Sequence, residues 1–278
     1  MKAYWYLMRL HRPIPILIIL WPTLWALFAA TQTHLPSIKH LIIFVVGVVL
    51  MRTAGCVFND ILDKDFDFKV KRTSTRPITT GEVSVKSALT LGIILLVIAF
   101  ILVLFLNLLT ILLSFVALIL ALTYPLFKRF FALPQLALGL AFNFGVIMAY
   151  SAELNTVPTA AWLMYIACIF WTLSYDTMYA LADKIYDQEL GLHSSALSFG
   201  KHVTLAITIC QTMMLIFLVS FAYTQSYNLI FYLALILCIY FFYYQYKLWK
   251  QDTIKDCISA FSHNHWVGLV IFIAILLQ

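Results

Sequence analysis

The chain has 278 residues, of which 63% are hydrophobic and only 11% are charged. Soluble domains carry about 25% charged residues, so this composition excludes an ordinary soluble domain and predicts an integral membrane protein. The net charge of +6 reflects basic residues in short polar segments, and we expect no nucleic-acid partner. The five cysteines lack the spacing of zinc ligands, which favours apolar fillers with free thiols.

Apolar runs of about 17 to 25 residues are long enough to cross a bilayer as helices. We predict an all-helical fold with about nine transmembrane helices, in a single membrane domain that covers residues 1–278. The predicted spans are 14–31, 39–60, 88–106, 109–125, 134–151, 159–181, 203–222, 228–246 and 258–277. Only Asn107 separates the third span from the fourth, and the polar segment 262–265 interrupts the start of the last.

The basic residues indicate how the chain is oriented. With nine spans, one side receives the N-terminus and the loops that hold nearly all Lys and Arg residues, whereas the other side receives only Lys39. Because Lys and Arg accumulate in short cytoplasmic loops, we predict a cytoplasmic N-terminus and a C-terminus on the far side.

Two acidic stretches lie at the cytoplasmic ends of the second and sixth predicted spans. Within each stretch the spacings of three, four and seven residues place the polar side chains on one helical face. These faces comprise Asp60, Asp63 and Asp67 in the first stretch, and Asp176, Tyr179, Asp183 and Asp187 in the second. Carboxylates so close together repel one another and resist leaving water, so they require a cation or a basic partner.

Each stretch contains two carboxylates four residues apart, a spacing at which both can bind one hard cation. These pairs are Asp63 with Asp67 and Asp183 with Asp187. Mg²⁺ is typically held by one or two carboxylates, with water and phosphate oxygens completing the octahedron. Two such clusters would hold two Mg²⁺ ions with a diphosphate between them. The alternative is that these carboxylates are solvated or paired with Lys and Arg, but the match between two clusters favours metal.

Basic residues near these carboxylates suit an anionic substrate. Arg72 and Arg76 follow the first stretch, and Lys128 and Arg129 lie in a loop on the same side. Arg clamps phosphate oxygens in two-point geometry, although such residues also serve as topology signals. Arg52 lies about two turns inside the second span, where an Arg usually faces a cavity or a partner. It either neutralises nearby carboxylates or binds an anionic substrate.

Three uncharged polar residues accompany the acidic faces. Asn59 can orient a metal-bound water or a carboxylate. Tyr175 and Tyr179 flank Asp176, and their rings either stabilise a carbocation through cation–π attraction or simply pack with hydrogen-bonded hydroxyls.

These features predict an enzyme that acts on a lipid diphosphate within the membrane. The predicted reaction is ionisation of an allylic diphosphate, followed by attack of a nucleophile on the cation. A cation transporter is the alternative from another class, but it would place ionisable groups near the bilayer midplane. Here nearly all acidic residues lie at one end of the spans, which favours the enzyme.

Several motifs, spread over almost the whole chain, resemble those of the UbiA superfamily of intramembrane prenyltransferases. The acidic motifs are Asn59-Asp-x-x-Asp63-x-x-x-Asp67 and Asp183-x-x-x-Asp187. Further segments are similar to the 4-hydroxybenzoate polyprenyltransferase branch, namely Leu20-Trp-Pro-Thr-Leu-Trp25, Met51-Arg-Thr-Ala-Gly-Cys56, Lys71-Arg-Thr-x-x-Arg-Pro77, Leu133-Pro-Gln135 and Tyr175-Asp-Thr-x-Tyr-Ala180.

The resemblance implies a ring of nine helices around a lipid-accessible cavity that binds a polyprenyl diphosphate. It implies Mg²⁺-dependent prenylation of 4-hydroxybenzoate next to its hydroxyl, in ubiquinone biosynthesis at a bacterial inner membrane. A UbiA-type enzyme with a different acceptor is the nearest alternative. By resemblance, the metal ligands are Asp63, Asp67, Asp183 and Asp187, with Asn59 and Asp60 completing the first motif; Arg72, Lys128 and Arg129 contact diphosphate, and Arg52 binds the aromatic acid.

Two segments depart from the family pattern. His193-Ser-Ser-Ala196 stands where the family commonly has Lys-Ser-Thr-Ala, so a permanent cation is replaced by a residue that titrates near neutrality. The segment Arg9-Leu-His-Arg-Pro13 lacks the acidic residue of the family's Arg-x-Asp-Lys-Pro pattern. Both departures bear on substrate detail or pH optimum and leave the predicted reaction class unchanged.

Overall fold

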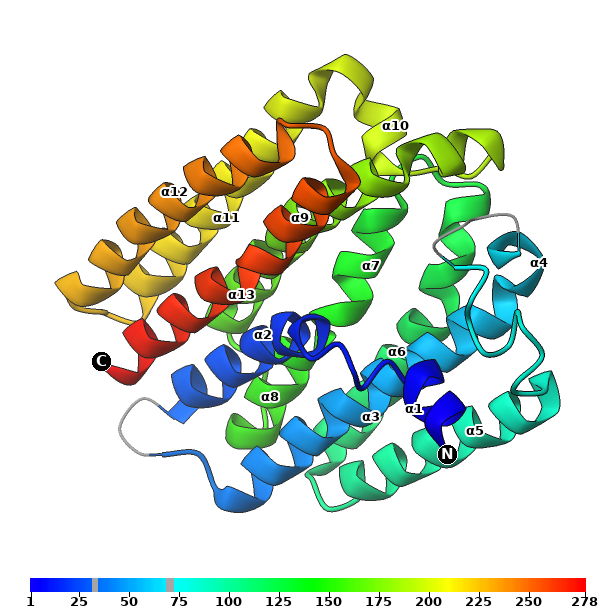
Figure 1. The fold of residues 1–278 in the computed structure, drawn as a ribbon. Coiled ribbons are helices and arrows are strands. Elements are labelled where there is room, and N and C mark those ends of the chain that lie inside the picture. Colours follow the sequence, from blue (N-terminus) through cyan, green and yellow to red (C-terminus); the bar gives the residue numbers. More distant parts are fainter. Residues whose placement is uncertain (32–34, 69–72) are drawn as a thin grey trace.

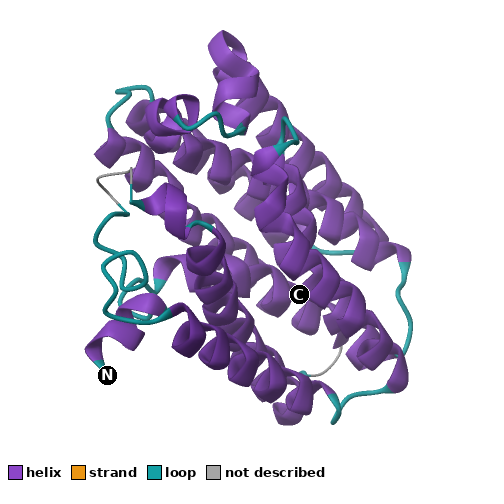
Figure 2. Cartoon of the chain, turned by 90° about the vertical axis from the view of Figure 1, so that its right-hand side faces the viewer, coloured by secondary structure: helices purple, strands orange, loops and turns teal. Residues whose placement is uncertain are grey.

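The computed structural model describes residues 1–31, 35–68 and 73–278, and all regular elements in these ranges are helical (Figure 1). The elements are α1 (Lys2–Leu7), α2 (Ile14–Thr31), α3 (Ile38–Leu62), α4 (Lys64–Asp67), α5 (Val85–Val103), α6 (Leu108–Thr123), the 3₁₀ helix η1 (Tyr124–Arg129), α7 (Pro134–Phe142), α8 (Phe144–Leu154), α9 (Thr159–Glu189), α10 (Ser195–Phe199), the 3₁₀ helix η2 (Gly200–His202), α11 (Val203–Thr224), α12 (Leu229–Trp249) and α13 (Ile254–Leu276). The long helices form a bundle in both views (Figure 2), which confirms the predicted all-helical fold.

Eight helical segments of the described chain are long and apolar enough to cross a bilayer. They begin at Ile14, Ile38, Val85, Leu108, Pro134, Ser195, Leu229 and Ile254. The ninth predicted span corresponds to α9, whose 31 residues would extend about 46 Å at 1.5 Å per residue. Acidic and hydroxyl-bearing residues lower the hydropathy of α9, but the helix lies inside the bundle and packs against α11, α13 and α7. The prediction of about nine helices is therefore close to the observed arrangement.

The fifth predicted span is broken into α7 and α8 at Asn143. The Asn143 side chain donates to the Gly139 carbonyl at 2.8 Å and to Thr172 Oγ1 at 2.8 Å, so it joins the break to α9. Because the side-chain amide satisfies buried acceptors on both helices, the interruption is stabilised without water. It positions α7 beside the acidic half of α9.

The polar residues that made two predicted boundaries uncertain have defined structural roles. Asn107 caps α6, since its Oδ1 accepts from the Thr110 N–H at 2.9 Å, and its amide also donates to the Ser151 carbonyl. Asn264 does not interrupt the last helix. It is fully buried within α13 and accepts from Trp171 Nε1 at 2.9 Å, so a polar residue in the span connects α13 to α9.

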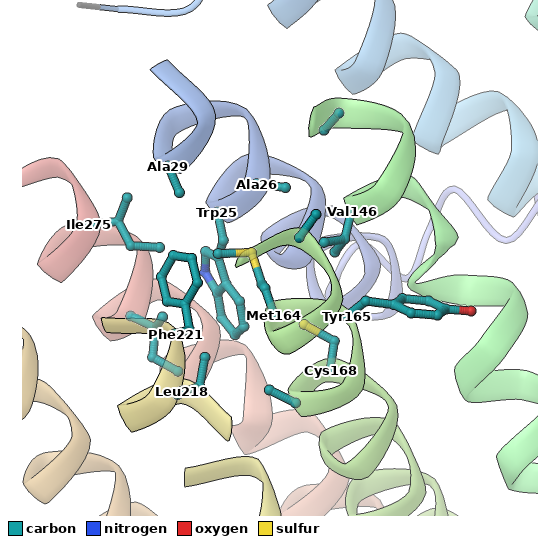
Figure 3. Close-up of a cluster of buried hydrophobic side chains, with 14 of the residues drawn as sticks. Trp25, Ala26, Ala29, Val146, Met164, Tyr165, Cys168, Leu218, Phe221 and Ile275 are labelled. Carbon is teal, nitrogen blue, oxygen red and sulfur yellow. The ribbon is translucent and has the colours of Figure 1, made fainter. Parts of the chain in front are cut away.

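The apolar core lies at the crossing of α2, α8, α9, α11 and α13 (Figure 3). The rings of Trp25 and Trp171 stack there with centroids 5.2 Å apart, and both residues are fully buried. Trp25 also donates its indole N–H to the Gly268 carbonyl at 2.9 Å. Aromatic packing and a satisfied indole therefore hold α2 against α9 and α13.

Gly268 of α13 packs closely against the Trp21 side chain of α2, and we predict that alanine at this position destabilises the fold. An added Cβ would lie 2.1 Å from Trp21 Cδ1, so the helices or the indole must move. Such overpacking typically costs about 1–3 kcal/mol. The apparent melting temperature of Gly268→Ala in detergent should fall below that of wild type.

Gly47→Ala is the matched control, because Gly47 lies in α3 and has nothing within 4 Å of its Cβ position. Removing a helical glycine there should leave stability unchanged or raise it by about 0.5–1 kcal/mol. Equal melting temperatures for the two variants would contradict the packing argument.

Candidate active site

A cavity of about 760 Å³ lies between α3, η1, α7, α9, α13 and the segment that joins α1 to α2. Nine of the twelve predicted site residues line it. They are Arg52, Asn59, Asp63, Asp67, Lys128, Tyr175, Tyr179, Asp183 and Asp187. The fold thus brings the two acidic stretches, about a hundred residues apart in sequence, to one cavity. The roles of the individual residues stay predictions.

Asp63 ends α3 and is held at the cavity wall with only 4% of its surface exposed. Its Oδ2 forms an ion pair with the Lys128 ammonium and accepts from Asn59 Nδ2 at 3.0 Å. Its Oδ1 is buried and has no hydrogen-bond partner among the described residues. A carboxylate oxygen in that state has a coordination position available for a cation.

Arg76 connects the other two carboxylates of the first stretch. Its Nη1 lies 2.5 Å from Asp67 Oδ2 and 3.0 Å from Asp60 Oδ1. Burial raises the pKa of the Asp67 carboxyl above its usual range, and the attraction of Arg76 opposes that rise. This guanidinium therefore offsets the charge of two acidic side chains, Asp60 in α3 and Asp67 in α4.

Asp60 is buried beneath the cavity and does not line it. Besides Arg76, it accepts from Arg9 Nη2 at 2.6 Å. Burial tends to lower the pKa of Arg9, but the attraction of Asp60, Cys56 and Tyr179, together with the hydrogen bond to Asp60, raises that pKa above its ordinary value. Asp60 thus pairs with two guanidinium groups, and its pair with Arg9 connects the N-terminal segment to the site.

The second acidic stretch lies on one face of α9. Asp176, Tyr179, Asp183 and Asp187 all line the cavity, as their spacing predicts. Tyr179 packs edge-on against Phe261 of α13, with ring centroids 5.1 Å apart. The four side chains follow the helix from the interior of the bundle toward its polar end.

Tyr175 has the character of a packing residue at the edge of this face. It is 3% exposed, its ring packs against Trp171 and Phe261, and its hydroxyl accepts from Thr172 Oγ1 at 3.0 Å. The ring nevertheless lines the cavity. Its packing partners keep it rigid, so it presents one defined aromatic surface.

Arg52 lies on the deep side of the cavity, on the same helix as Asp63. Its Nη1 contacts Cys56 Sγ, whereas its Nε is buried and has no partner within the described part of the chain. A guanidinium is always charged, so an unpaired buried N–H here suits an anionic ligand group. This arrangement is compatible with the predicted contact to an aromatic acid.

Three other predicted residues do not line the cavity in the described structure. Asp60 lies behind it, as described above. Arg129 is exposed and donates to the Leu62 carbonyl at 2.9 Å. Arg72 lies outside the described residues.

The fold places several further residues at the site that the sequence analysis did not assign to it. Arg9 and Gln135 could have been found from the sequence, because Arg9 lies in the motif that departs from the family pattern and Gln135 lies in a motif that supports the resemblance. Gln135 Oε1 accepts from the Ser195 N–H at 2.8 Å. His193, which stands where the family commonly has Lys, also lines the cavity, and its backbone N–H donates to the Lys128 carbonyl at 2.8 Å. Phe261 had no distinguishing sequence signal.

The carboxylates fit a hard cation by chemistry, although they are not gathered as a ligand cage. Within residues 1–31, 35–68 and 73–278, no three His, Cys, Asp or Glu side chains are positioned to bind one metal ion. Lys128 and Arg76 instead lie against Asp63 and Asp67. The free oxygen of Asp63 and the all-oxygen donor set suit Mg²⁺, which needs few protein ligands.

Solved structures of other proteins have a fold similar to that of this chain. A UbiA homolog from Aeropyrum pernix K1, solved without ligand, superposes with a TM-score of 0.80 at 26% identity, covering 93% of this chain and 97% of that one. A UbiA homolog from Archaeoglobus fulgidus, solved with GPP and Mg²⁺, gives a TM-score of 0.74 at 18% identity, covering 99% of each chain. The second likeness is one of fold alone.

Sequence relatives are closer. A 4-hydroxybenzoate octaprenyltransferase from Francisella tularensis subsp. mediasiatica (strain FSC147) is 56% identical over 278 residues, covering 100% of this chain and 98% of that protein. A protein of the same name from Nitrosospira multiformis is 46% identical over 272 residues, covering 98% and 93%. Residues 19–274 match the UbiA prenyltransferase family. The chain is an integral membrane protein of the UbiA prenyltransferase family.

Proposed function

We propose that this protein transfers a polyprenyl group from a polyprenyl diphosphate to 4-hydroxybenzoate, at the ring carbon ortho to the hydroxyl, in ubiquinone biosynthesis. The observation that carries the proposal is the distribution of charge around the cavity. Acidic pairs and Lys128 lie at its polar end, and Arg52 lies deeper on α3. The polar end suits a metal-bound diphosphate, and Arg52 suits the carboxylate of an aromatic acid. The names of the relatives support the same pair of substrates.

Mg²⁺ is the cofactor that this donor set suits best. Asp63, Asp67, Asp183 and Asp187 would hold it, with Asn59 and Asp60 completing the first motif. When bound, the ion neutralises charge on the leaving diphosphate. The protein's own cations would neutralise the same charge, since Lys128 and Arg76 can exchange a carboxylate for phosphate oxygens. Arg72 and Arg129 are further candidates for that contact.

The aromatic residues of the cavity suit the developing allylic cation. Tyr179 and Tyr175 both contact Phe261, with ring centroids 5.1 Å and 5.7 Å apart. Faces of such rings attract a cation, so these side chains would stabilise the allylic cation until the aromatic acceptor attacks it.

We further propose that the N-terminus and the polar end of the cavity face the cytoplasm, with the C-terminus on the far side of the inner membrane. The basic segments support this orientation, because Lys and Arg are retained in cytoplasmic loops. It gives a water-soluble aromatic acid direct access to the site, while the polyprenyl chain remains in lipid.

Arg52→Gln should raise the KM for 4-hydroxybenzoate by about 10- to 100-fold, because hydrogen bonds to charged groups contribute about 1.5–3 kcal/mol. The KM for the polyprenyl diphosphate should change little. Lys247→Gln is the matched control, since Lys247 lies over the Tyr243 ring at the end of α12 and outside the cavity. Equal changes in both KM values would argue against a contact between Arg52 and the aromatic acid.

The proposed function is tested by incubating membranes that contain the protein with labelled 4-hydroxybenzoate and a polyprenyl diphosphate, with Mg²⁺ or with a chelator. Prenylated 4-hydroxybenzoate should form only with Mg²⁺. Other aromatic acceptors, added in parallel, test the alternative of a UbiA-type enzyme with a different acceptor. Absence of the prenylated product with Mg²⁺ present would overturn the assignment.

A further inference from the structure

The proposed reaction releases a proton that none of the roles above accounts for. The C–O bond of the allylic diphosphate breaks, and its electron pair leaves with the diphosphate. A C–C bond then forms between the allylic carbon and the ring carbon ortho to the hydroxyl. That ring carbon now bears both the prenyl group and a hydrogen, so it must lose a proton to restore aromaticity. A base beside the ring would accept it.

Five carboxylates of the described chain line the cavity, and four of them have other functions or partners. Asp63 and Asp67 are paired with Lys128 and Arg76. Asp183 and Asp187 form the acidic pair that we propose as metal ligands. The fifth is Asp176, which lies on the same face of α9, seven residues before Asp183.

Asp176 on α9 and Arg52 on α3 both lie farther into the bundle than the acidic pairs on the same helices. At 1.5 Å per residue, Asp176 lies about 10 Å deeper than Asp183, and Arg52 lies about 16 Å from Asp63 along its own helix. Arg52 and Asp176 line the same cavity and attract each other electrostatically. An aromatic acid whose carboxylate binds Arg52 would therefore lie with its ring near Asp176, below the diphosphate end.

Gln135 holds the Asp176 carboxylate in a defined orientation. The backbone N–H of Ser195 can only donate, and Gln135 Oε1 accepts from it at 2.8 Å. The other end of the amide is then a donor, and it is within hydrogen-bonding reach of Asp176. The Ser195 hydroxyl is in turn 2.7 Å from Thr177 Oγ1, so this contact chain joins α10, α7 and α9.

We propose that Asp176 is the base that accepts the ring proton of the aromatic acceptor, and that Gln135 is its positioning residue. The inference rests on the proposed function, since it assigns one step of that reaction. Asp176 receives the proton as the aromatic ring re-forms, and the proton then passes to water at the polar end of the cavity. The carboxylate is regenerated for the next turnover.

The test compares wild type with Asp176→Asn, using 4-hydroxybenzoate with either hydrogen or deuterium at both ring carbons ortho to the hydroxyl. Loss of a general base typically slows the step about 10²- to 10⁴-fold, so the maximal rate of the variant should fall by that factor. The hydrogen-to-deuterium rate ratio should rise above that of wild type, because proton removal becomes limiting. The KM for the aromatic acid should stay close to the wild-type value. The asparagine still accepts from Gln135, which favours an unchanged fold.

Gln135→Met and Glu82→Gln complete the comparison. Met has a similar volume but cannot hydrogen-bond to Asp176, so the maximal rate should fall and the isotope ratio should rise, as in Asp176→Asn but less. Glu82 is exposed and outside the cavity, so its variant should behave as wild type. An isotope ratio that is unchanged in Asp176→Asn, or a rate within about tenfold of wild type, would overturn the assignment to Asp176. Failure of the wild-type protein to form product would instead overturn the proposed function.

Discussion

Asp63→Asn and Asp183→Asn should each lower prenyl transfer by about 10³-fold or more, while the protein still inserts into membranes. Each substitution removes one negative charge from a pair proposed to hold Mg²⁺, and metal neutralisation of a leaving group lowers the barrier by several kcal/mol. The larger effect is expected for Asp63, because its buried Oδ1 has no partner in the described part of the chain, whereas Oδ2 is already engaged by Lys128 and Asn59.

Turnover in membranes and Mg²⁺ binding by calorimetry in detergent should be measured on the same preparations. Glu82→Gln is the matched control, since it neutralises an exposed carboxylate outside the cavity. Weakened metal binding together with lost turnover would support the ligand role. Near-normal turnover in either aspartate variant would contradict it.

Lys128→Gln should make the protein depend on Mg²⁺ for stability. The Lys128 ammonium neutralises Asp63, whose carboxylate is 4% exposed. Removing one member of a buried ion pair leaves an uncompensated charge, at a cost of about 3–5 kcal/mol. Lys128 is itself partly exposed, so we expect a smaller loss of about 1–3 kcal/mol without metal. Mg²⁺ should then restore stability by taking the place of the ammonium beside Asp63.

The measurement is the apparent melting temperature in detergent, with and without Mg²⁺. The rise caused by Mg²⁺ should be larger in Lys128→Gln than in wild type, in which the ammonium competes for the same carboxylate. The double variant Lys128→Gln with Asp63→Asn removes both charges, and its response to Mg²⁺ should be small. An equal Mg²⁺ response in wild type and Lys128→Gln would show that Lys128 and the metal do not compete.

The helices could be predicted because membrane spans need long apolar segments, which are visible in the sequence itself. Asn107 and the polar residues near Asn264 made two predicted helix boundaries uncertain, since a polar residue can either cap a helix end or bond within the bundle. Asn107 does both, since it caps the start of α6 and donates to the Ser151 carbonyl, whereas Asn264 only bonds within the bundle. The choice depends on which partners lie beside the side chain, and hydropathy carries no information on those partners.

Much of the candidate site could also be predicted, because residues seven and eleven apart on one helix must share a face. This local geometry places Asp183 and Asp187 on the same helical face as Asp176. By contrast, no local pattern indicated that Arg9 would reach Asp60 or that Gln135 would reach Asp176. Those pairs are 51 and 41 residues apart and belong to different elements.

The sequence by itself determined a helical membrane protein with two acidic helix faces, because hydropathy and helical periodicity are properties of consecutive residues. Only the tertiary structure decided which cation neutralises which carboxylate. Arg76 with Asp67, Lys128 with Asp63, and Arg9 with Asp60 are pairings that follow from how the bundle closes. The same closure brings Arg52 and Asp176 to one cavity and leaves one oxygen of Asp63 without a partner among the residues that the structure describes. Charge balance in a buried site is a property of the packed helices, since it depends on distances that no single helix sets.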